Sequence, residues 1–383
     1  MCADPTPARS AGPPAPRRAG PPAPRRAGPP APRRAGGIPR ATVRGLSLLE
    51  LMVGLVIALL VSLTAASGAM LFTATQRQGI GAGGTLVSAG TALAALRDDV
   101  AAAGLGFFGD SQFLCRRLNL SVDTTVLLDG VDFTPVSIAT EAGGDRIDVL
   151  YATDVSSGAN VLLNAAAGAG SAPLRSLLPV SAGQAVLLAP ATPGDPCTVR
   201  TVTTNTAAGI DTPQLIEYAN VSTARFNRAA FTTNPTYPDR GRVTLLGDLR
   251  WSRYRLVGTD LTLERPLGGG AVVLARNVIA FRAEYGLADA GTAALASWQA
   301  AAGGFATLTP ANLPRVRALR IGLVTRSTQR EKPNAAGDCE ASAAMPTLFG
   351  AAVAADVTDW QCYRYRSSTL VVPLRNLVLG MVP

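Results

Sequence analysis

The sequence predicts an α+β protein in which a long N-terminal helix, transmembrane at its start, packs on a C-terminal antiparallel β-sheet domain. Three observations predict this class. An uncharged apolar run extends from Leu51 to Gln76. A helical spacing of apolar residues follows it. Short alternating segments, separated by Gly, Pro, Asn and Asp, occupy the rest of the 383-residue chain.

Residues 1–45 are the first predicted segment, a leader rich in Pro and Arg. Three copies of AGPPAPRR run from Ala11 to Arg34 and favour extended polyproline II over a packed fold. The leader holds nine of the 35 basic and one of the 26 acidic residues, so the other 26 basic and 25 acidic residues nearly cancel. The net charge of +9 therefore does not indicate a nucleic-acid-binding fold. We interpret the repeats as a processed leader or as upstream codons; a linker or a tether to an anionic surface is the alternative.

The second predicted segment, 46–104, is the N-terminal helix, and its transmembrane part is 46–72. The 22 uncharged residues that end at Phe72 would span ~33 Å as a helix, at ~1.5 Å per residue, which is enough to cross a bilayer. Arg40 and Arg44 precede the span, so the positive-inside tendency places the N-terminus in the cytoplasm. In a bacterium, the chain would pass once through the inner membrane and place its C-terminal domain in the periplasm.

Glycine shapes the second half of this helix. Four glycines lie within residues 79–84, and each weakens a helix by up to ~1 kcal/mol, which predicts a bend or local melting there. The helical spacing returns between Leu86 and Ala103, and Gly104 is expected to end the helix.

The third predicted segment, 105–383, is the antiparallel β-rich domain. Strands are predicted in the alternating segments that begin at Asp145, Gln184 and Cys197. Leu249–Leu267 reads as a hairpin that turns at Gly258, Thr259 and Asp260. The late runs that begin at Val316 and Tyr363 alternate in the same way and are expected to pair in one sheet.

Residue types argue against most enzyme chemistry. The chain has no histidine, which excludes a Ser-His-Asp or Cys-His arrangement and a haem with a His ligand, and it has no CxxC spacing for a zinc site. Neither a P-loop nor a dinucleotide fingerprint is present. Asp98 and Asp99, beside Arg97, are interpreted as a solvated charged face. We therefore expect no enzyme activity, no cofactor, no metal and no small-molecule substrate.

The sequence YRYR, Tyr363–Arg366, alternates aromatic and basic side chains and could stack on nucleic-acid bases. The mature chain is nearly neutral, so we interpret the segment as an ordinary strand with its tyrosines facing inward and expect no nucleic-acid partner.

Glu50 is the one carboxylate near the start of the apolar run. An unpaired carboxylate in hydrocarbon costs several kcal/mol, which makes it a functional hypothesis by default. The alternative is an interfacial side chain that reaches the headgroups, and the carboxylate alone does not decide between the two.

The surrounding sequence, RGLSLLELMVGLVIALL, resembles the class III signal of type IV prepilins. In that signal a basic leader ends in Gly, an apolar residue follows, and Glu is fifth after the cleavage site; here these are Gly45, Leu46 and Glu50. The family usually has Phe at the first mature position, where this chain has Leu46. The resemblance implies cleavage between Gly45 and Leu46 by a prepilin peptidase, methylation of the new amine, and pairing of Glu50 with the N-terminal amine of a neighbouring subunit.

Other segments narrow the resemblance to PilW-type minor pilins. Leu96–Gly109, LRDDVAAAGLGFFG, resembles the end of their helix, and Tyr363–Asn376 resembles their closing strand with its Pro-Leu-Arg-Asn ending. Asn277–Asp289 and Val316–Ser327 resemble the strands between, shared in looser form with J-type pseudopilins of type II secretion. The match is patchy between about 110 and 240. The resemblance implies a type IV pilin-like fold.

Four cysteines follow the membrane span, an even number that suits disulfides in an oxidising compartment. A Cys that the family often has directly after Phe-Gly is replaced by Asp110, with Cys115 five residues on, which leaves the partner of Cys115 open. Cys339 and Cys362 flank one insertion before the last strand and are the expected pair, contributing roughly 3 kcal/mol. Pairing of Cys115 with Cys197 follows by elimination.

Three functions are compatible with these sequence features. The first is a PilW-type minor pilin, an assembly subunit whose partners are the prepilin peptidase, the other minor pilins, the major pilin and the inner membrane. The second is a J-type minor pseudopilin of a type II secretion system. The third is a periplasmic enzyme or binding protein held by an uncleaved anchor, which would keep an intact N-terminus. The resemblance favours the first, located in the inner membrane and, after assembly, in the pilus at the cell surface.

Overall fold

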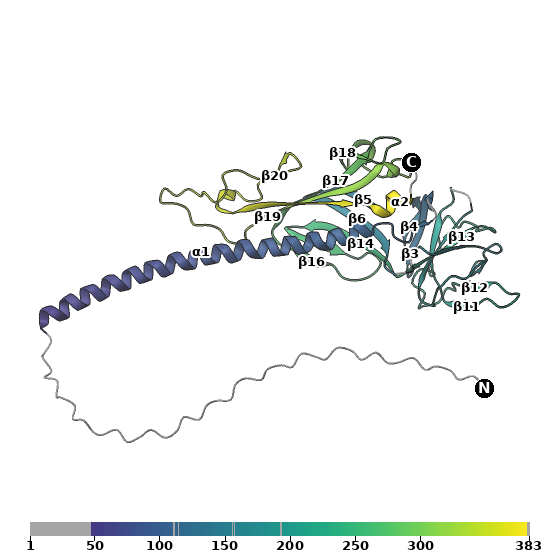
Figure 1. The fold of residues 1–383 in the computed structure, drawn as a ribbon, viewed down its shortest axis with the longest axis horizontal. Helices are drawn as coiled ribbons and strands as arrows, with labels where there is room; N and C mark the ends of the chain where they lie inside the picture. Colours follow the sequence, from purple (N-terminus) through teal and green to yellow (C-terminus); the bar gives the residue numbers. More distant parts are fainter. Residues whose placement is uncertain are drawn as a thin grey trace, which may run out of the picture. The chain divides into compact units, whose positions relative to one another are not determined.

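The computed structural model describes residues 47–109, 112–113, 115–154, 156, 158–191 and 194–380 (Figure 1). The chain divides into two units, Met1–Ala66 and Ser67–Pro383. The leader repeats and the expected cleavage site at Gly45 and Leu46 lie outside the described residues.

Helix α1 extends without interruption from Leu48 to Ala102. The local melting expected at the glycines of 79–84 is therefore wrong. Helix propagation is cooperative, and breaking the ladder there would require a second costly nucleation, which outweighs the weak propensity of four glycines. The expected end is confirmed, because Gly104 adopts a φ of +77° and its N–H donates to the carbonyl of Leu150 at 3.0 Å.

Two antiparallel sheets form the part of the domain that packs on α1. The five-stranded sheet has the order β16 (Val272–Ala275), β15 (Asp260–Glu264), β14 (Leu249–Val257), β6 (Gly144–Ala152) and β5 (Val136–Glu141). The four-stranded sheet has the order β18 (Leu295–Ala300), β17 (Val278–Ala288), β19 (Val316–Arg326) and β22 (Tyr365–Pro373).

Both predicted pairings in these sheets are confirmed. β14 and β15 form the expected hairpin, in which Val257 faces Asp260, so the turn contains only Gly258 and Thr259. Gly258 has a φ of +63°, a conformation that favours glycine. β19 pairs antiparallel with β22 from Ala318–Pro373 to Arg326–Tyr365, as the two late alternating runs predicted.

The main core lies where the C-terminal part of α1 meets the two sheets (Figure 1). Ala89, Ala92, Leu96 and Val100 of the helix are buried at the spacings of three and four residues that define one helix face. On β6, Ile147, Val149 and Tyr151 alternate inward toward this core. Burying each large apolar side chain contributes about 1.5–3 kcal/mol, which attaches the end of the helix to the sheets.

A second lobe is inserted into this arrangement. Its six-stranded sheet has the order β4 (Thr125–Asp132), β3 (Arg117–Val122), β10 (Cys197–Thr201), β9 (Ala185–Ala189), β13 (Arg242–Gly247) and β7 (Asn160–Leu162). A three-stranded sheet accompanies it, with the order β11 (Thr204–Thr206), β12 (Gln214–Glu217) and β8 (Ser171–Leu174). The chain enters the lobe before β5 and again between β6 and β14, so this lobe occupies most of the segment where the family resemblance was patchy.

Strands predicted at Asp145, Gln184 and Cys197 correspond to β6, β9 and β10. The antiparallel β-rich domain is confirmed, with one exception in the described chain: β10 pairs parallel with β3. The two strands are far apart in the sequence, so the long connection that a parallel pair requires is available.

Small elements complete the described chain. They are β1 (Phe108–Gly109), β2 (Gln112–Phe113), β20 (Thr347–Leu348), β21 (Ala351–Ala352), the 3-10 turns Gly303–Phe305, Leu313–Arg315 and Trp360–Cys362, and α2 (Arg375–Gly380). Tyr363 lies just before β22, and Tyr365 is half-buried against the small cluster that contains Val324 and Leu348. The segment YRYR is thus a strand entrance with Tyr365 facing inward.

Candidate functional site

The N-terminal part of α1 presents an exposed apolar surface with one carboxylate. Leu48–Ala69 is long and apolar enough to cross a membrane, with a mean hydropathy of 2.4, and none of it is buried within the chain. Glu50 lies in the first turn of the helix, where a negative charge interacts favourably with the helix dipole. It forms no ion pair with any residue of the described chain.

Other polar groups in the span find partners within the helix. The hydroxyl of Thr64 donates to the carbonyls of Leu60 and Val61 at 3.1 and 2.9 Å, and such internal bonding removes the cost of a hydroxyl in lipid. Glu50 has no comparable internal bond among the described residues. Glu50 is the one charged residue of the span, and no residue of the described chain pairs with it.

The other end of α1 is held by polar contacts. Asp99 accepts hydrogen bonds from the hydroxyls of Tyr151 on β6 and Tyr254 on β14, each at 2.6 Å. Burial, followed by the charge and hydrogen bond of Asp99, raises the pKa of Tyr254 well above its ordinary value. Asn376 of α2 donates to the carbonyl of Ala103 at 3.2 Å, which satisfies a carbonyl at the helix end.

This arrangement corrects one expectation. Asp98 is solvated, in an exposed ion pair with Arg97 at 3.1 Å, as predicted. Asp99 is not part of a solvated face, because it points between two strands and accepts from their tyrosines. The helical spacing alone carried a signal, since Asp99 follows Leu96 by three residues and so lies near the buried face.

The structure joins Cys115 to Cys197 by a disulfide with a Cα–Cα distance of 5.7 Å. Both residues are buried in the apolar cluster of the second lobe, beside Leu118 and Leu120. The bond connects the entrance of β3 to the start of β10, which stabilises the parallel pairing of these strands.

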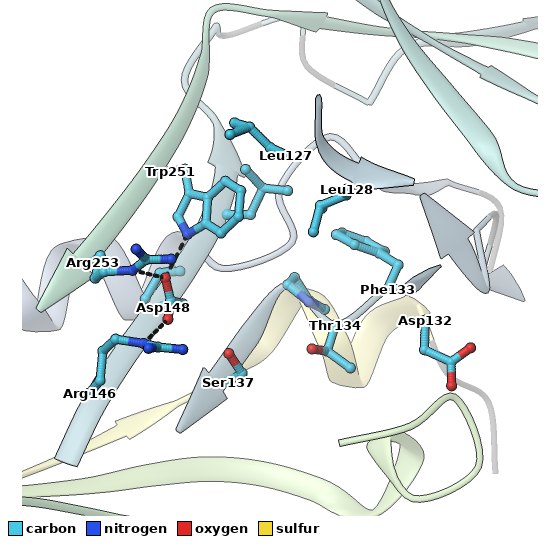
Figure 2. A pocket seen from close by; sticks show the side chains of 13 residues that line it. Leu127, Leu128, Asp132, Phe133, Thr134, Ser137, Arg146, Asp148, Trp251 and Arg253 are labelled. Carbon is cyan, nitrogen blue, oxygen red and sulfur yellow. Dashed lines mark hydrogen bonds and ion pairs between the residues drawn. The ribbon is translucent and has the colours of Figure 1, made fainter. Parts of the chain in front are cut away.

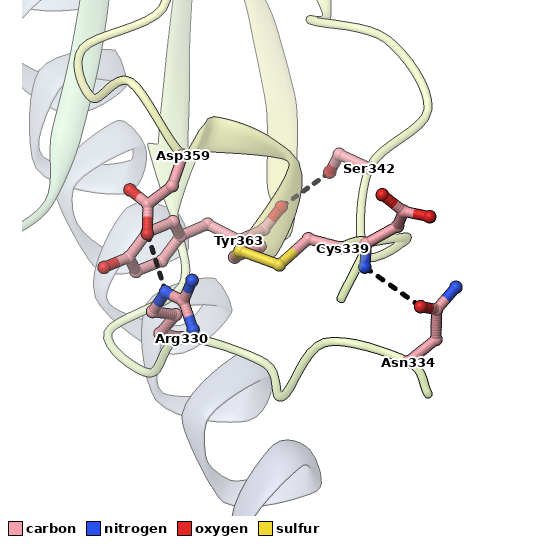
Figure 3. Close-up of a disulfide and its surroundings, with 8 residues drawn as sticks. Arg330, Asn334, Cys339, Ser342, Asp359 and Tyr363 are labelled. Atoms are coloured by element: carbon pink, nitrogen blue, oxygen red, sulfur yellow. Dashed lines mark hydrogen bonds and ion pairs between the residues drawn. A yellow bond between two sulfur atoms is a disulfide. The ribbon is translucent and has the colours of Figure 1, made fainter. Parts of the chain in front are cut away.

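A second disulfide joins Cys339 to Cys362, with a Cα–Cα distance of 4.7 Å (Figure 3). It closes the insertion between β19 and β22. The hydroxyl of Ser342 donates to the carbonyl of Tyr363 at 2.7 Å, and Arg330 pairs with Asp359 at 2.6 Å, so polar contacts on both sides order this loop.

The face of the five-stranded sheet that points away from α1 carries a charged network. Asp148 of β6 is buried and accepts from Arg146 and from Arg253 of β14, each at 2.7 Å, and from the indole of Trp251 at 2.8 Å. Arg146 also pairs with Glu141 at 2.6 Å. Burial alone would lower the pKa of Arg146, but these two carboxylates raise it above its ordinary value.

This network forms one wall of a cavity of about 340 Å³ between the five-stranded sheet and the second lobe (Figure 2). Leu127, Leu128 and Phe133 contribute an apolar side, and Thr134 and Ser137 contribute hydroxyl groups. The two arginines of the network are balanced by Asp148 and Glu141, so the charges stabilise one another. Sequence reasoning missed this site, although alternation in β6 and β14 placed Arg146, Asp148 and Arg253 on one face.

Among the described residues, no group of three or more His, Cys, Asp or Glu side chains could hold a metal ion.

An α+β protein, in which a long N-terminal helix that is apolar enough to cross a membrane packs at its other end on antiparallel sheets, is the class that this architecture defines. Residues 255–376 match the family described as Type IV Pilus-assembly protein W. The matched region extends from β14 through β22 to the start of α2. The resemblance to PilW-type pilins is confirmed over these residues, and the match does not extend to the second lobe.

Other comparisons add less. No curated protein matches the sequence significantly. A solved structure, a Type IV-like pilin from Thermus thermophilus, is 11% identical, with a TM-score of 0.27, and the similarity covers 79% of this chain and 96% of that chain. At that TM-score the similarity carries no argument about the fold, which rests on the helix and sheets described above.

Proposed function

We propose that this chain is a PilW-type minor pilin, a non-enzymatic subunit that helps to initiate or cap type IV pilus assembly. The observation that carries the proposal is the exposed apolar span of α1 with the unpaired carboxylate of Glu50 in its first turn. The PilW match in the C-terminal region supports it independently.

Processing would precede assembly. A prepilin peptidase at the cytoplasmic side of the inner membrane cleaves between Gly45 and Leu46, and the new amine of Leu46 is methylated. The mature N-terminus then lies four residues before Glu50 in the sequence, so a positive amine and a carboxylate both occupy the first helical turns. The Arg-rich leader, with most of the excess positive charge, is removed.

Glu50 would fix the axial position of the subunit in the pilus. In the membrane, an unpaired carboxylate costs several kcal/mol. In a bundle of pilin helices, the methylated amine of a neighbouring subunit pairs with it, and the low dielectric strengthens the ion pair. Subunits in other registers leave the carboxylate unpaired, so the cost of a buried charge selects one axial position. The partners are therefore the N-terminal helices of other minor pilins and of the major pilin.

The location follows from the same steps. Before assembly the subunit crosses the inner membrane once, with its C-terminal domain in the periplasm, where the two disulfides form. After assembly it lies in the pilus at the cell surface.

Mass spectrometry of the N-terminal peptide from membrane-extracted protein tests the processing step. The expected peptide begins at N-methylated Leu46, and Gly45→Val should block its formation. An intact N-terminus in the unmodified chain would refute the proposal and favour a periplasmic protein held by an uncleaved anchor.

Recovery in sheared pili tests the assembly step. Glu50→Ala should insert into the membrane and be processed, but it should be depleted from the pilus fraction because the amine loses its partner. Thr64→Ala is the matched control on the same helix, since Thr64 bonds to carbonyls of its own helix. Normal recovery of the Glu50 variant would contradict the pairing argument. Co-isolation with secretion pseudopilins in place of pilins would favour the J-type alternative.

A further inference from the structure

A second cavity, of about 330 Å³, lies beside the first and shares Trp251 with it. Arg225, Arg250 and Arg265 line it, and Asp248 is the one carboxylate among its lining residues. The three arginines come from separate segments: the connection between β12 and β13 of the second lobe, β14, and the turn after β15. Three guanidinium groups around one carboxylate leave an excess of two positive charges.

Within the described chain, the three guanidinium groups have few or weak bonding partners. Arg265 has no ion pair or hydrogen bond from its side chain to any described residue. Arg250 approaches Asp248 only at 3.6 Å, longer than a hydrogen bond. Arg225 donates one N–H to the carbonyl of Leu267, a neutral partner that leaves its charge uncompensated.

The neighbouring network on the outer face of the sheet provides a comparison. There, two arginines meet two carboxylates at 2.6–2.7 Å, and the positive charges are neutralised. The excess in the second cavity is therefore not a general consequence of a protein rich in arginine. Like charges gathered around a hollow repel one another, and an anion in the hollow relieves the repulsion.

The backbone beside the cavity keeps one guanidinium accessible. Gly268 has a φ of +124°, and a Cβ at this position would approach the guanidinium of Arg225 to 3.0 Å. Glycine thus permits a conformation that other residues rarely adopt and leaves space at the Arg225 head group.

We propose that this cavity binds a phosphate group. Guanidinium groups present paired N–H donors that match the oxygens of a phosphate, and charge-assisted bonds of this kind are the strong ones. The phosphate is either free or carried on a sugar. In the second case the sugar ring lies beside Trp251, the residue that lines both cavities.

Isothermal titration of the full chain in detergent, at low ionic strength, tests the proposal with three probes: inorganic phosphate, glucose 6-phosphate and glucose. Arg250→Gln and Arg265→Gln should each weaken phosphate binding roughly tenfold or more. Arg364→Gln is the charge-matched control, because Arg364 pairs with Glu331 in the disulfide-closed insertion. It should bind phosphate like the unmodified chain, and thermal unfolding of each variant shows that it is folded.

The probes separate the two sources of the phosphate. Binding of inorganic phosphate and glucose 6-phosphate with equal affinity supports a free phosphate, whereas tighter binding of glucose 6-phosphate, lost in Trp251→Ala, supports a phosphorylated sugar. Binding of glucose alone, absence of binding by both phosphate probes, or an equal loss in Arg364→Gln and Arg265→Gln would each overturn the proposal.

Discussion

The contact between Asp99 and two tyrosines yields the sharpest test of how α1 is attached to the domain. Tyr254 is fully buried, and its hydroxyl donates to Asp99 at 2.6 Å, with the carbonyl of Ala95 more distant at 3.4 Å. Tyr254→Phe removes this hydroxyl and leaves the ring in place. Asp99 then keeps one of its two tyrosine donors, Tyr151.

The expected magnitude follows from the chemistry of the bond. A hydrogen bond to a charged group contributes about 1.5–3 kcal/mol, so Tyr254→Phe should destabilise the domain by that amount. Asp99→Ala removes both bonds and leaves two buried hydroxyls without their acceptor, at roughly 3–5 kcal/mol. For a domain of this size, the smaller loss lowers the melting temperature by roughly 3–10 °C.

Thermal unfolding of the full chain in detergent, followed by near-UV circular dichroism, measures these losses. The comparison variant is Tyr365→Phe, whose hydroxyl donates to Asp356 at 3.0 Å; Tyr365 is half-buried where Tyr254 is fully buried, so its loss should be the smaller of the two. The double variant at positions 99 and 254 should lose less than the sum of the single losses. If Tyr254→Phe unfolded like Tyr365→Phe, Asp99 would not anchor the helix.

Two further predictions concern disulfides and alkaline pH. Removal of the Cys115–Cys197 bond, which spans 82 residues, should cost about 4.5 kcal/mol, against about 3.4 kcal/mol for the Cys339–Cys362 bond, which spans 23. Denaturant midpoints of the two double Cys→Ala variants measure this, and the reverse order would contradict it. Burial and the Asp99 contact raise the pKa of Tyr151 to about 12, against ~10 unfolded, so its stabilising contribution is complete below pH ~10 and lost through pH ~12. A melting temperature constant across that window would refute this.

Local sequence patterns predicted the elements of the two sheets next to α1 well. The hairpin of β14 and β15 and the pairing of β19 with β22 depend on alternation and on a turn, which are visible within short windows. In the second lobe, strands β9 and β10 were predicted but their sheet was not, because it joins strands distant in the chain, such as β3 with β10. Alternation marks a strand but does not identify its partner. The glycine cluster shows the opposite error, in which local propensity was given more weight than cooperativity.

The candidate sites show the same difference between patterns within short windows and contacts between residues distant in the sequence. Glu50 could be predicted as a functional residue because the residues that distinguish it are its neighbours in the sequence, an apolar run on both sides of one carboxylate. The acceptor role of Asp99 depends on tyrosines 52 and 155 residues away, so the local pair with Arg97 was misleading. The phosphate cavity likewise assembles arginines from three separate segments.

Asp148 tests whether the neutral network beside that cavity is structural. It accepts from Arg146, Trp251 and Arg253, so Asp148→Ala leaves the partly buried guanidinium of Arg253 without its carboxylate and that of Arg146 with Glu141 alone, and should cost roughly 2–4 kcal/mol. Asp98→Ala, which breaks only an exposed ion pair, should cost less than about 1 kcal/mol. Thermal unfolding compares them. Because the change removes one negative charge beside two arginines, Asp148→Ala should also gain affinity for inorganic phosphate at the first cavity. If Asp148→Ala were as stable as Asp98→Ala, the network would not hold β6 to β14. The distinction between structural arginines at the first cavity and ligand-binding arginines at the second would then fail.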